Sequence, residues 1–197
     1  MRQQVLFYLK IFAGIYVMAL GIATITVPTY FSNILGLLSV MSYILSLIPG
    51  ILKVILPSAK KNTVLIALLK HRRFLGVAAF MLALNHGALQ FIKENINLLE
   101  SSTYIHYFQG LTMMVIMTIL AATSSDESVK AFKKNWKKIH KLTYLIIFLL
   151  PWHIVDKMSN HWTFVTPIAL LLSTILLSLF LFRFYKERQA TIAKYLS

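Results

Sequence analysis

Residues 74–93 read FLGVAAFMLALNHGALQFIK, and residues 141–157 read KLTYLIIFLLPWHIVDK. Both stretches are close to the ~20 apolar residues that a helix needs to cross a hydrocarbon core. Each carries one histidine far from its ends, His86 in the first and His153 in the second. A titratable imidazole in hydrocarbon is costly, so the two histidines are candidate functional residues.

The composition is that of an integral membrane protein. Of the 197 residues, 58% are hydrophobic and only 13% are charged, and the mean hydropathy is +0.71. A chain of this length has room for a single transmembrane domain over residues 1–197, without a soluble catalytic domain of ordinary size. Cysteine is absent, which excludes iron–sulfur clusters and thiolate-bound heme or zinc and leaves histidine as the main metal ligand.

Six apolar stretches are long enough to cross a membrane, and they predict an all-α bundle of six transmembrane helices. The first is interpreted as a span rather than a cleavable signal, because it runs past twenty residues and has no small-residue cleavage site before Pro28. The predicted spans are 5–27, 35–56, 74–93, 104–123, 141–157 and 164–183.

The basic residues predict the orientation of this bundle. The net charge of +14 gathers in the N-terminus, the segments 60–73 and 130–141, and the C-terminus, whereas the opposite side receives only Lys93 and Lys157. Because cytoplasmic loops are enriched in Lys and Arg, the pattern predicts that both termini face the cytoplasm. The same rule explains the charge without nucleic-acid binding, although the basic surface also suits an acidic electron donor or anionic lipid.

The two histidines are predicted to lie at the same depth. Each is about twelve residues, or ~18 Å, from the inner end of its predicted span. Level imidazoles on separate helices suggest the axial ligands of a heme held between the third and fifth helices. Gly76 and Gly87 on the third helix would leave room for the macrocycle.

Two further histidines bear on whether a second heme binds. His71 and His86 are about 60° apart on an ideal helix, so both can face one interior. His140 and His153 are about 140° apart, a poor fit unless the fifth helix is overwound, kinked at Pro151 or begins after His140. His71 also lies in the basic run 70–73, where an interfacial cation is an equally good interpretation.

The other candidate ligands are better explained without a metal. His106 and His161 lie near the predicted outer surface, where an interfacial role is favoured. Met113, Met114 and Met117 are expected to pack within the bundle.

Several of these residues together resemble the ferric-reductase-like transmembrane domain family. The resemblance comprises Arg72-Arg73 followed by Phe74-Leu75-Gly76, His86, the run Thr123–Ser125, Trp136 and His140 in one short segment, and His153. It covers about residues 72–162 and is strongest toward the short bacterial members, such as the heme-binding membrane subunit of a periplasmic methionine sulfoxide reductase system.

The resemblance implies that His86 and His153 ligate a b-type heme and that His140 belongs to the heme-binding set. Arg72, Arg73 and Trp136 would contact propionates or the inner surface. His71 has no secure counterpart in the short members, whereas longer relatives use two histidines on each of two helices. One heme b, and at most two, is therefore expected.

Transmembrane electron transfer is the function that these features predict. An electron would enter from a cytoplasmic-side or membrane donor, pass over heme and leave to an acceptor at the outer face. The chain shows no glycine-rich dinucleotide fingerprint, so FAD or FMN is expected only through a partner or weakly bound, and the donor is expected to be a separate flavoprotein reductase, a quinol or a small carrier. The expected location is the bacterial cytoplasmic membrane or an internal energy-transducing membrane such as the thylakoid.

Two alternatives of different classes remain open. The first is an enzyme that reduces ferric or cupric chelates directly at the outer face, where Tyr104, His106, Asp156 and His161 would gather the chelate. The second is a heme-free structural or assembly subunit of a membrane complex, and the matched histidines speak against it.

Overall fold

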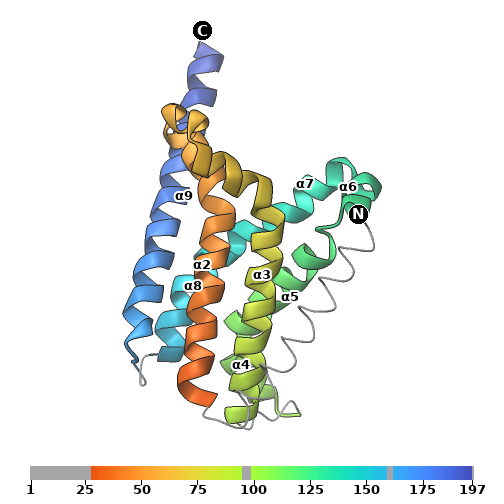
Figure 1. The fold of residues 1–197 in the computed structure, drawn as a ribbon, viewed down its shortest axis with the longest axis vertical. Coiled ribbons are helices and arrows are strands. Elements are labelled where there is room, and N and C mark those ends of the chain that lie inside the picture. Colours follow the sequence, from red (N-terminus) through yellow and green to blue (C-terminus); the bar gives the residue numbers. More distant parts are fainter. Residues whose placement is uncertain (1–27, 95–98, 159–161, 197) are drawn as a thin grey trace.

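The computed structural model describes residues 28–94, 99–158 and 162–196. In these residues the chain forms α-helices, two short 3-10 helices (Pro57–Lys61 and His140–Leu142) and no strand. Figure 1 shows the long helices lying side by side as a bundle. The α-helices are α2 (Pro28–Ile55), α3 (Thr63–Lys93), α4 (Ser101–His106), α5 (Phe108–Ala122), α6 (Asp126–Phe132), α7 (Lys134–Ile139), α8 (Thr143–Met158) and α9 (Val165–Leu196).

Four segments are long and apolar enough to cross a membrane, namely Phe31–Ile55, Thr63–Lys93, Lys134–Met158 and Val165–Ala193. A fifth is obtained if α5 and α6, which meet at a 93° bend, count as one broken span. The predicted spans 35–56, 74–93, 141–157 and 164–183 fall on these four segments. The predicted span 5–27 lies outside the described residues, so the structure bears on four or five spans rather than six.

The predicted span 104–123 differs most from the structure. It falls on two helices, because α4 ends at His106 and α5 begins at Phe108. Hydropathy measures the length of an apolar stretch and does not reveal an interruption of the helix at one residue such as Tyr107.

The helix α3 begins earlier than the expected residue 74. Asn62 caps its N-terminus by accepting hydrogen bonds from the backbone N–H groups of Val64 and Leu65, which fixes the start there. Residues 63–74 are mostly exposed, and Figure 1 shows this first part of α3 running obliquely before the helix descends along the bundle. The basic run 70–73 therefore marks a change of environment within one continuous helix.

Five of the described helices pack in a closed ring. The helix α2 contacts α3 and α9, α8 contacts α9 and α5, and α5 contacts α3. Each of the five contributes a buried side chain to one apolar core: Ile51, Ala79, Met113, Ile147 and Leu176. Burial of such side chains stabilises the arrangement by about 1.5–3 kcal/mol each. The extensive helix pairs of the described chain do not include α3 with α8, and both of these helices pack on α5.

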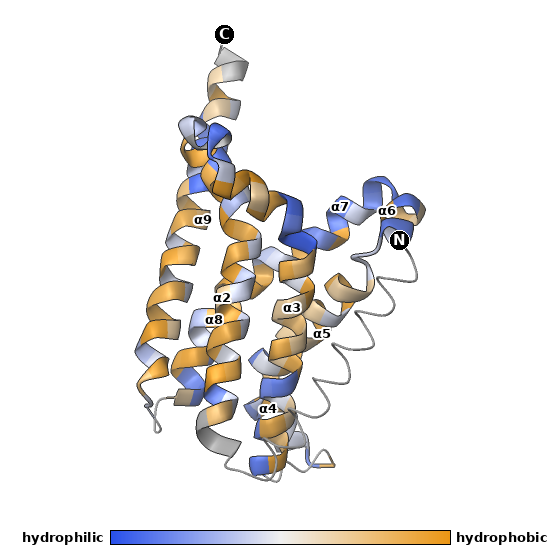
Figure 2. Ribbon diagram, viewed as in Figure 1, coloured by the Kyte–Doolittle hydropathy of each residue, from blue (hydrophilic) through white to orange (hydrophobic). Residues whose placement is uncertain are grey.

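Hydrophilic residues gather mainly toward one end of the bundle. Figure 2 shows them over α6, α7, the part of α3 where it turns down along the bundle and the connection between α2 and α3. At this end Lys186 of α9 donates from Nζ to the carbonyl oxygen of Ile55 at 3.0 Å. Of the basic segments that the sequence predicted for one side of the membrane, 60–73 and 130–141 thus share one end of the structure, and the N-terminal one lies outside the described residues.

Candidate functional site

His86 is held by the first turns of α2. Its Nδ1 lies 2.8 Å from the carbonyl oxygen of Ser32 and 3.1 Å from Ser32 Oγ. The hydroxyl of Ser32 in turn donates to the carbonyl oxygen of His86 at 3.3 Å, and Ser32 is fully buried. Because a carbonyl oxygen can only accept, His86 carries its proton on Nδ1, which leaves the Nε2 lone pair available to a metal.

Gly36 lies against the same imidazole. A Cβ placed on Gly36 would approach His86 Nδ1 to 3.2 Å and Cε1 to 3.3 Å, closer than ordinary van der Waals contact. Gly36 follows Ser32 by four residues and so lies on the same face of α2. One helix face therefore supplies both the hydrogen-bond acceptor and the space for the ring.

The ring of His153 also lies against a glycine of a neighbouring helix. It comes from α8, and a Cβ on Gly110 of α5 would approach its Cε1 to 3.2 Å. Its Nδ1 differs from that of His86, because it is buried and has no hydrogen-bond partner in the described part of the chain.

The structure places His140 at a junction of short helices. The ring of His140 stacks on Trp136, with centroids 4.0 Å apart and planes 28° from parallel. Its Nε2 lies 3.2 Å from Thr123 Oγ1, and Trp136 Nε1 donates to the carbonyl oxygen of Thr123 at 2.8 Å. The helix α8 begins at Thr143, after His140, which is one of the three arrangements left open by the spacing of His140 and His153.

His71 and the two arginines beside it lie on an exposed part of α3. Arg73 forms an ion pair with Asp126 at the start of α6 and lies 6.0 Å from the centre of the Trp136 ring. The hydrogen bond and charge of Arg73 lower the pKa of the Asp126 carboxyl below its ordinary value of 3.8. Arg73 thus attaches α6 to α3, and its contact with propionates or the inner surface stays a prediction.

The glycines predicted to make room for a macrocycle behave differently from each other. A Cβ on Gly76 would meet no atom within 4 Å, whereas one on Gly87 would contact Met114 Cε at 3.4 Å. Space along α3 is therefore open at Gly76 and filled by a flexible methionine at Gly87.

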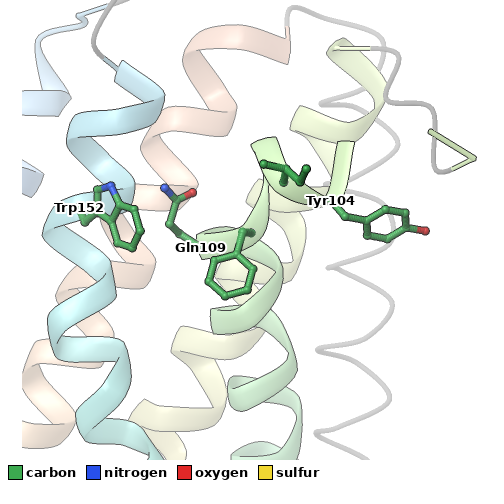
Figure 3. Close-up of a pocket in the computed structure, with 5 residues that line it drawn as sticks. Tyr104, Gln109 and Trp152 are labelled. Carbon is green, nitrogen blue, oxygen red and sulfur yellow. The ribbon is translucent and has the colours of Figure 1, made fainter. Parts of the chain in front are cut away.

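A pocket of about 370 Å³ lies between residues of α4, α5 and α8, at the end of the bundle that holds α4. It is lined by Tyr104, Ile105, Phe108, Gln109 and Trp152. Figure 3 shows Gln109 and Trp152 on neighbouring helices, with the Tyr104 ring pointing away from both. The amide Nε2 of Gln109 donates to Asp156 Oδ2 at 3.3 Å, and its Oε1 is buried without a partner among the described residues.

The other candidate metal ligands, which the sequence predicted to lie near the outer surface, do not form a metal site within the described residues. His106 is exposed and its ring meets Tyr107 edge-on at 4.7 Å, while His161 lies outside the described residues. Lys157 Nζ donates to the carbonyl oxygen of His106, which ties the end of α8 to α4. Within the described ranges, the chain places no three His, Cys, Asp or Glu side chains where they could share an ion.

The residues at His86 and His153 fit a heme. Two imidazoles on separate helices are a donor set for the axial positions of heme iron. The buried, unpaired Nδ1 of His153 is the kind of polar atom that calls for a functional explanation. The glycines beside the rings admit both imidazoles between closely packed helices. Sequence reasoning missed Ser32, Gly36 and Gly110, although the spacing of Ser32 and Gly36 on one helix face was available as a signal.

Comparison with known proteins identifies the family. The family described as "Ferric reductase like transmembrane component" matches residues 35–151, more than half of the chain. The chain belongs to this family. It is accordingly a multi-pass integral membrane protein. The matched segment includes His86 and His140 and ends two residues before His153.

The relatives of this chain include heme-binding subunits and a magnetosome protein. The heme-binding subunit MsrQ of the protein-methionine-sulfoxide reductase of Brucella anthropi is 33% identical over 86 residues, 41% of this chain and 39% of that protein. MsrQ of Brucella melitensis is 30% identical over 122 residues, 59% of this chain and 52% of that protein. Magnetosome protein MamZ of Magnetospirillum gryphiswaldense is 32% identical over 101 residues, 48% of this chain and 15% of that protein.

The chain thus spans about half, or less, of the length of the curated relatives it matches. No solved structure matches it.

Proposed function

We propose that the chain is a heme-containing electron-transfer protein of the membrane, with one b-type heme held by His86 and His153. The observation that carries the proposal is the pair of imidazoles on α3 and α8, each seated against a glycine of a neighbouring helix. The name of the MsrQ relatives, which are heme-binding subunits, supports the same cofactor. When bound, the heme supplies a reversible one-electron redox centre.

The chain's own residues would bind the heme, fix its orientation and exclude water. Nδ1 of His86 donates to Ser32, so Nε2 is the nitrogen that His86 presents. The apolar core formed by α2, α3, α5, α8 and α9 keeps the surroundings of the site dry, and a dry environment is one of the determinants of heme potential. The pocket lined by Gln109 and Trp152 would let an electron acceptor approach this end of the bundle.

A single heme is proposed rather than two. His140 Nε2 already faces Thr123 Oγ1 at 3.2 Å, and His71 is exposed. Ligation of a second heme by His140 Nε2 would require this nitrogen to give up its contact with Thr123 Oγ1. Two hemes are therefore an outcome that would overturn this part of the proposal.

Donor and acceptor are proposed to be separate molecules on opposite sides. The basic end with α6 and α7 would face the cytoplasm and receive electrons from a flavoprotein, a quinol or a small carrier, and FAD or FMN would come with that partner. The end with α4 would face outward and deliver them to a reductase, as the name of the MsrQ relatives suggests. We propose the cytoplasmic membrane of a bacterium as the location.

Orientation can be tested directly because the chain has no cysteine. Single cysteines introduced as Lys134→Cys and Ser102→Cys would be treated with a membrane-impermeant maleimide in intact cells. Labelling of Ser102→Cys alone is expected. Labelling of Lys134→Cys alone would reverse the proposed direction.

Electron transfer itself can be measured in vesicles. Reduced FMN is added outside proteoliposomes that contain the purified full chain and trapped ferricyanide. We expect ferricyanide to be consumed with the wild-type chain and with the His106→Ala control, and to stay at the protein-free background rate with His86→Ala/His153→Ala. A double variant as fast as the wild type would refute the proposal.

A further inference from the structure

The two imidazoles differ in how firmly the protein holds them. Nδ1 of His86 is within hydrogen-bonding distance of both the carbonyl oxygen and the hydroxyl of Ser32, at 2.8 Å and 3.1 Å. Nδ1 of His153 is buried and has no partner in the described ranges. A hydrogen bond from the second ring nitrogen fixes the orientation of a ligating histidine and raises its basicity.

Resting on the proposed function, we infer that the two axial ligands are unequal: His86 is the anchored ligand, positioned by Ser32 and Gly36, and His153 is the exchangeable one. Heme iron would then keep its bond to His86 when an external ligand competes, and the bond to His153 would be the one that opens. The position that opens would be on the His153 side, and the pocket lined by Gln109 and Trp152 lies on the same two helices, α5 and α8, that carry Gly110 and His153. Small exogenous ligands such as carbon monoxide are the chemical class that this position would take.

The glycines beside the rings provide a matched comparison. A Cβ would come to 3.2 Å from the ring of His86 if placed on Gly36, and to 3.2 Å from the ring of His153 if placed on Gly110. In each case the imidazole must give way by a few tenths of an ångström. The His153 ring has no hydrogen bond at Nδ1 to lose by moving, whereas the His86 ring can move only by stretching its bonds to Ser32.

Ser32 links the anchored ligand, His86, to helix α2. It is completely buried, and its hydroxyl also donates to the backbone of His86. The pair therefore holds α2 and α3 in register at the level of the ligand. Because the principal acceptor is the backbone carbonyl of Ser32, displacement of the ring by Gly36→Ala is a stronger perturbation than removal of the hydroxyl.

The test compares single histidine variants of the full chain in detergent. Heme content is measured by pyridine hemochrome, and carbon monoxide binding by the shift of the ferrous Soret band. We expect His153→Ala to keep most of its heme in a five-coordinate form that binds carbon monoxide. His86→Ala is expected to lose most of its heme, because it removes the ligand that the protein holds in place.

The glycine variants keep both imidazoles. They serve as a control for the possibility that a histidine variant loses heme because it misfolds. Gly36→Ala is expected to shift the low-spin ferric EPR signal and weaken heme binding, and Gly110→Ala to leave both near wild type. Three results would overturn the inference and still leave His86 and His153 as the two ligands. They are equal loss of heme from both histidine variants, equal effects of both glycine variants, and retention of heme by His86→Ala alone. Wild-type six-coordinate spectra in both histidine variants would overturn the proposed ligation as well.

Discussion

The hydroxyl of Tyr43 in α2 donates a hydrogen bond to the carbonyl oxygen of Thr143, the first residue of α8, at 2.6 Å. Tyr43 is buried, so its side chain crosses the interior of the ring of helices. It reaches the backbone three residues after His140. The interior next to His140 is thus occupied by a tyrosine and closed by a hydrogen bond.

Loss of this hydroxyl is expected to weaken the fold without emptying the site. Tyr43→Phe keeps the ring and removes one buried hydrogen bond, so the free energy of unfolding should fall by about 1 kcal/mol. Thermal unfolding in detergent, followed by circular dichroism, measures the change. The heme content of Tyr43→Phe should equal that of the wild type, and a large loss of heme would place Tyr43 in the binding site instead.

Acid is expected to release α6 from α3. The pKa of Asp126 lies below its ordinary value because Arg73 donates to it and carries the opposite charge. The ion pair therefore contributes stability above the ordinary pKa of 3.8, and this contribution is lost as the pH falls through the lowered value. The protection of the α6 amides, measured as the exchange rate relative to the intrinsic rate at the same pH, should fall below about pH 4. Asp126→Asn should show the low protection at every pH, and a wild type whose protection does not fall in acid would argue against the pair.

Replacing His140 is expected to leave the heme count unchanged. Its Nε2 faces Thr123 and its ring stacks on Trp136, so its role in the structure is to join short helices. His140→Ala should lower the unfolding temperature while heme per chain, by pyridine hemochrome, stays at one. His71→Ala serves as the exposed control, and a fall from two hemes to one in either variant would establish the second site.

Gly76→Ala distinguishes one heme from two by a different route. A Cβ at this position meets no protein atom within 4 Å, and alanine is favoured over glycine inside a helix by about 0.5–1 kcal/mol. With a single heme at His86 and His153, the variant should be slightly more stable and carry the wild-type amount of heme. Loss of heme from Gly76→Ala would mean that a macrocycle lies over this glycine.

Membrane spans were largely predictable because apolar length is a local property of the sequence. The predictions at 35–56, 74–93, 141–157 and 164–183 all fall on membrane-length helical segments. The break at Tyr107 was not predictable in the same way, since residues on both sides of it are apolar or neutral and helix-compatible. The start of α3 at Thr63 was missed because charge at residues 70–73 ends a span without ending a helix.

The candidate site was predictable in its chemistry and not in its surroundings. His86 and His153 stand out because imidazoles are rare in hydrocarbon. Which side chains hold them depends on contacts between residues such as Ser32 and His86, which are 54 positions apart. Gly87 shows the same limit, because its neighbour Met114 comes from another helix.

The most direct test of the central claim is the reduced-minus-oxidised absorption spectrum of the purified full chain, with heme quantified as pyridine hemochrome, beside that of His86→Ala/His153→Ala. We predict one b-type heme per wild-type chain, with the sharp bands of a six-coordinate low-spin iron, and no heme in the double variant. A wild type without a Soret band, or a double variant that retains the wild-type spectrum, would contradict ligation by His86 and His153.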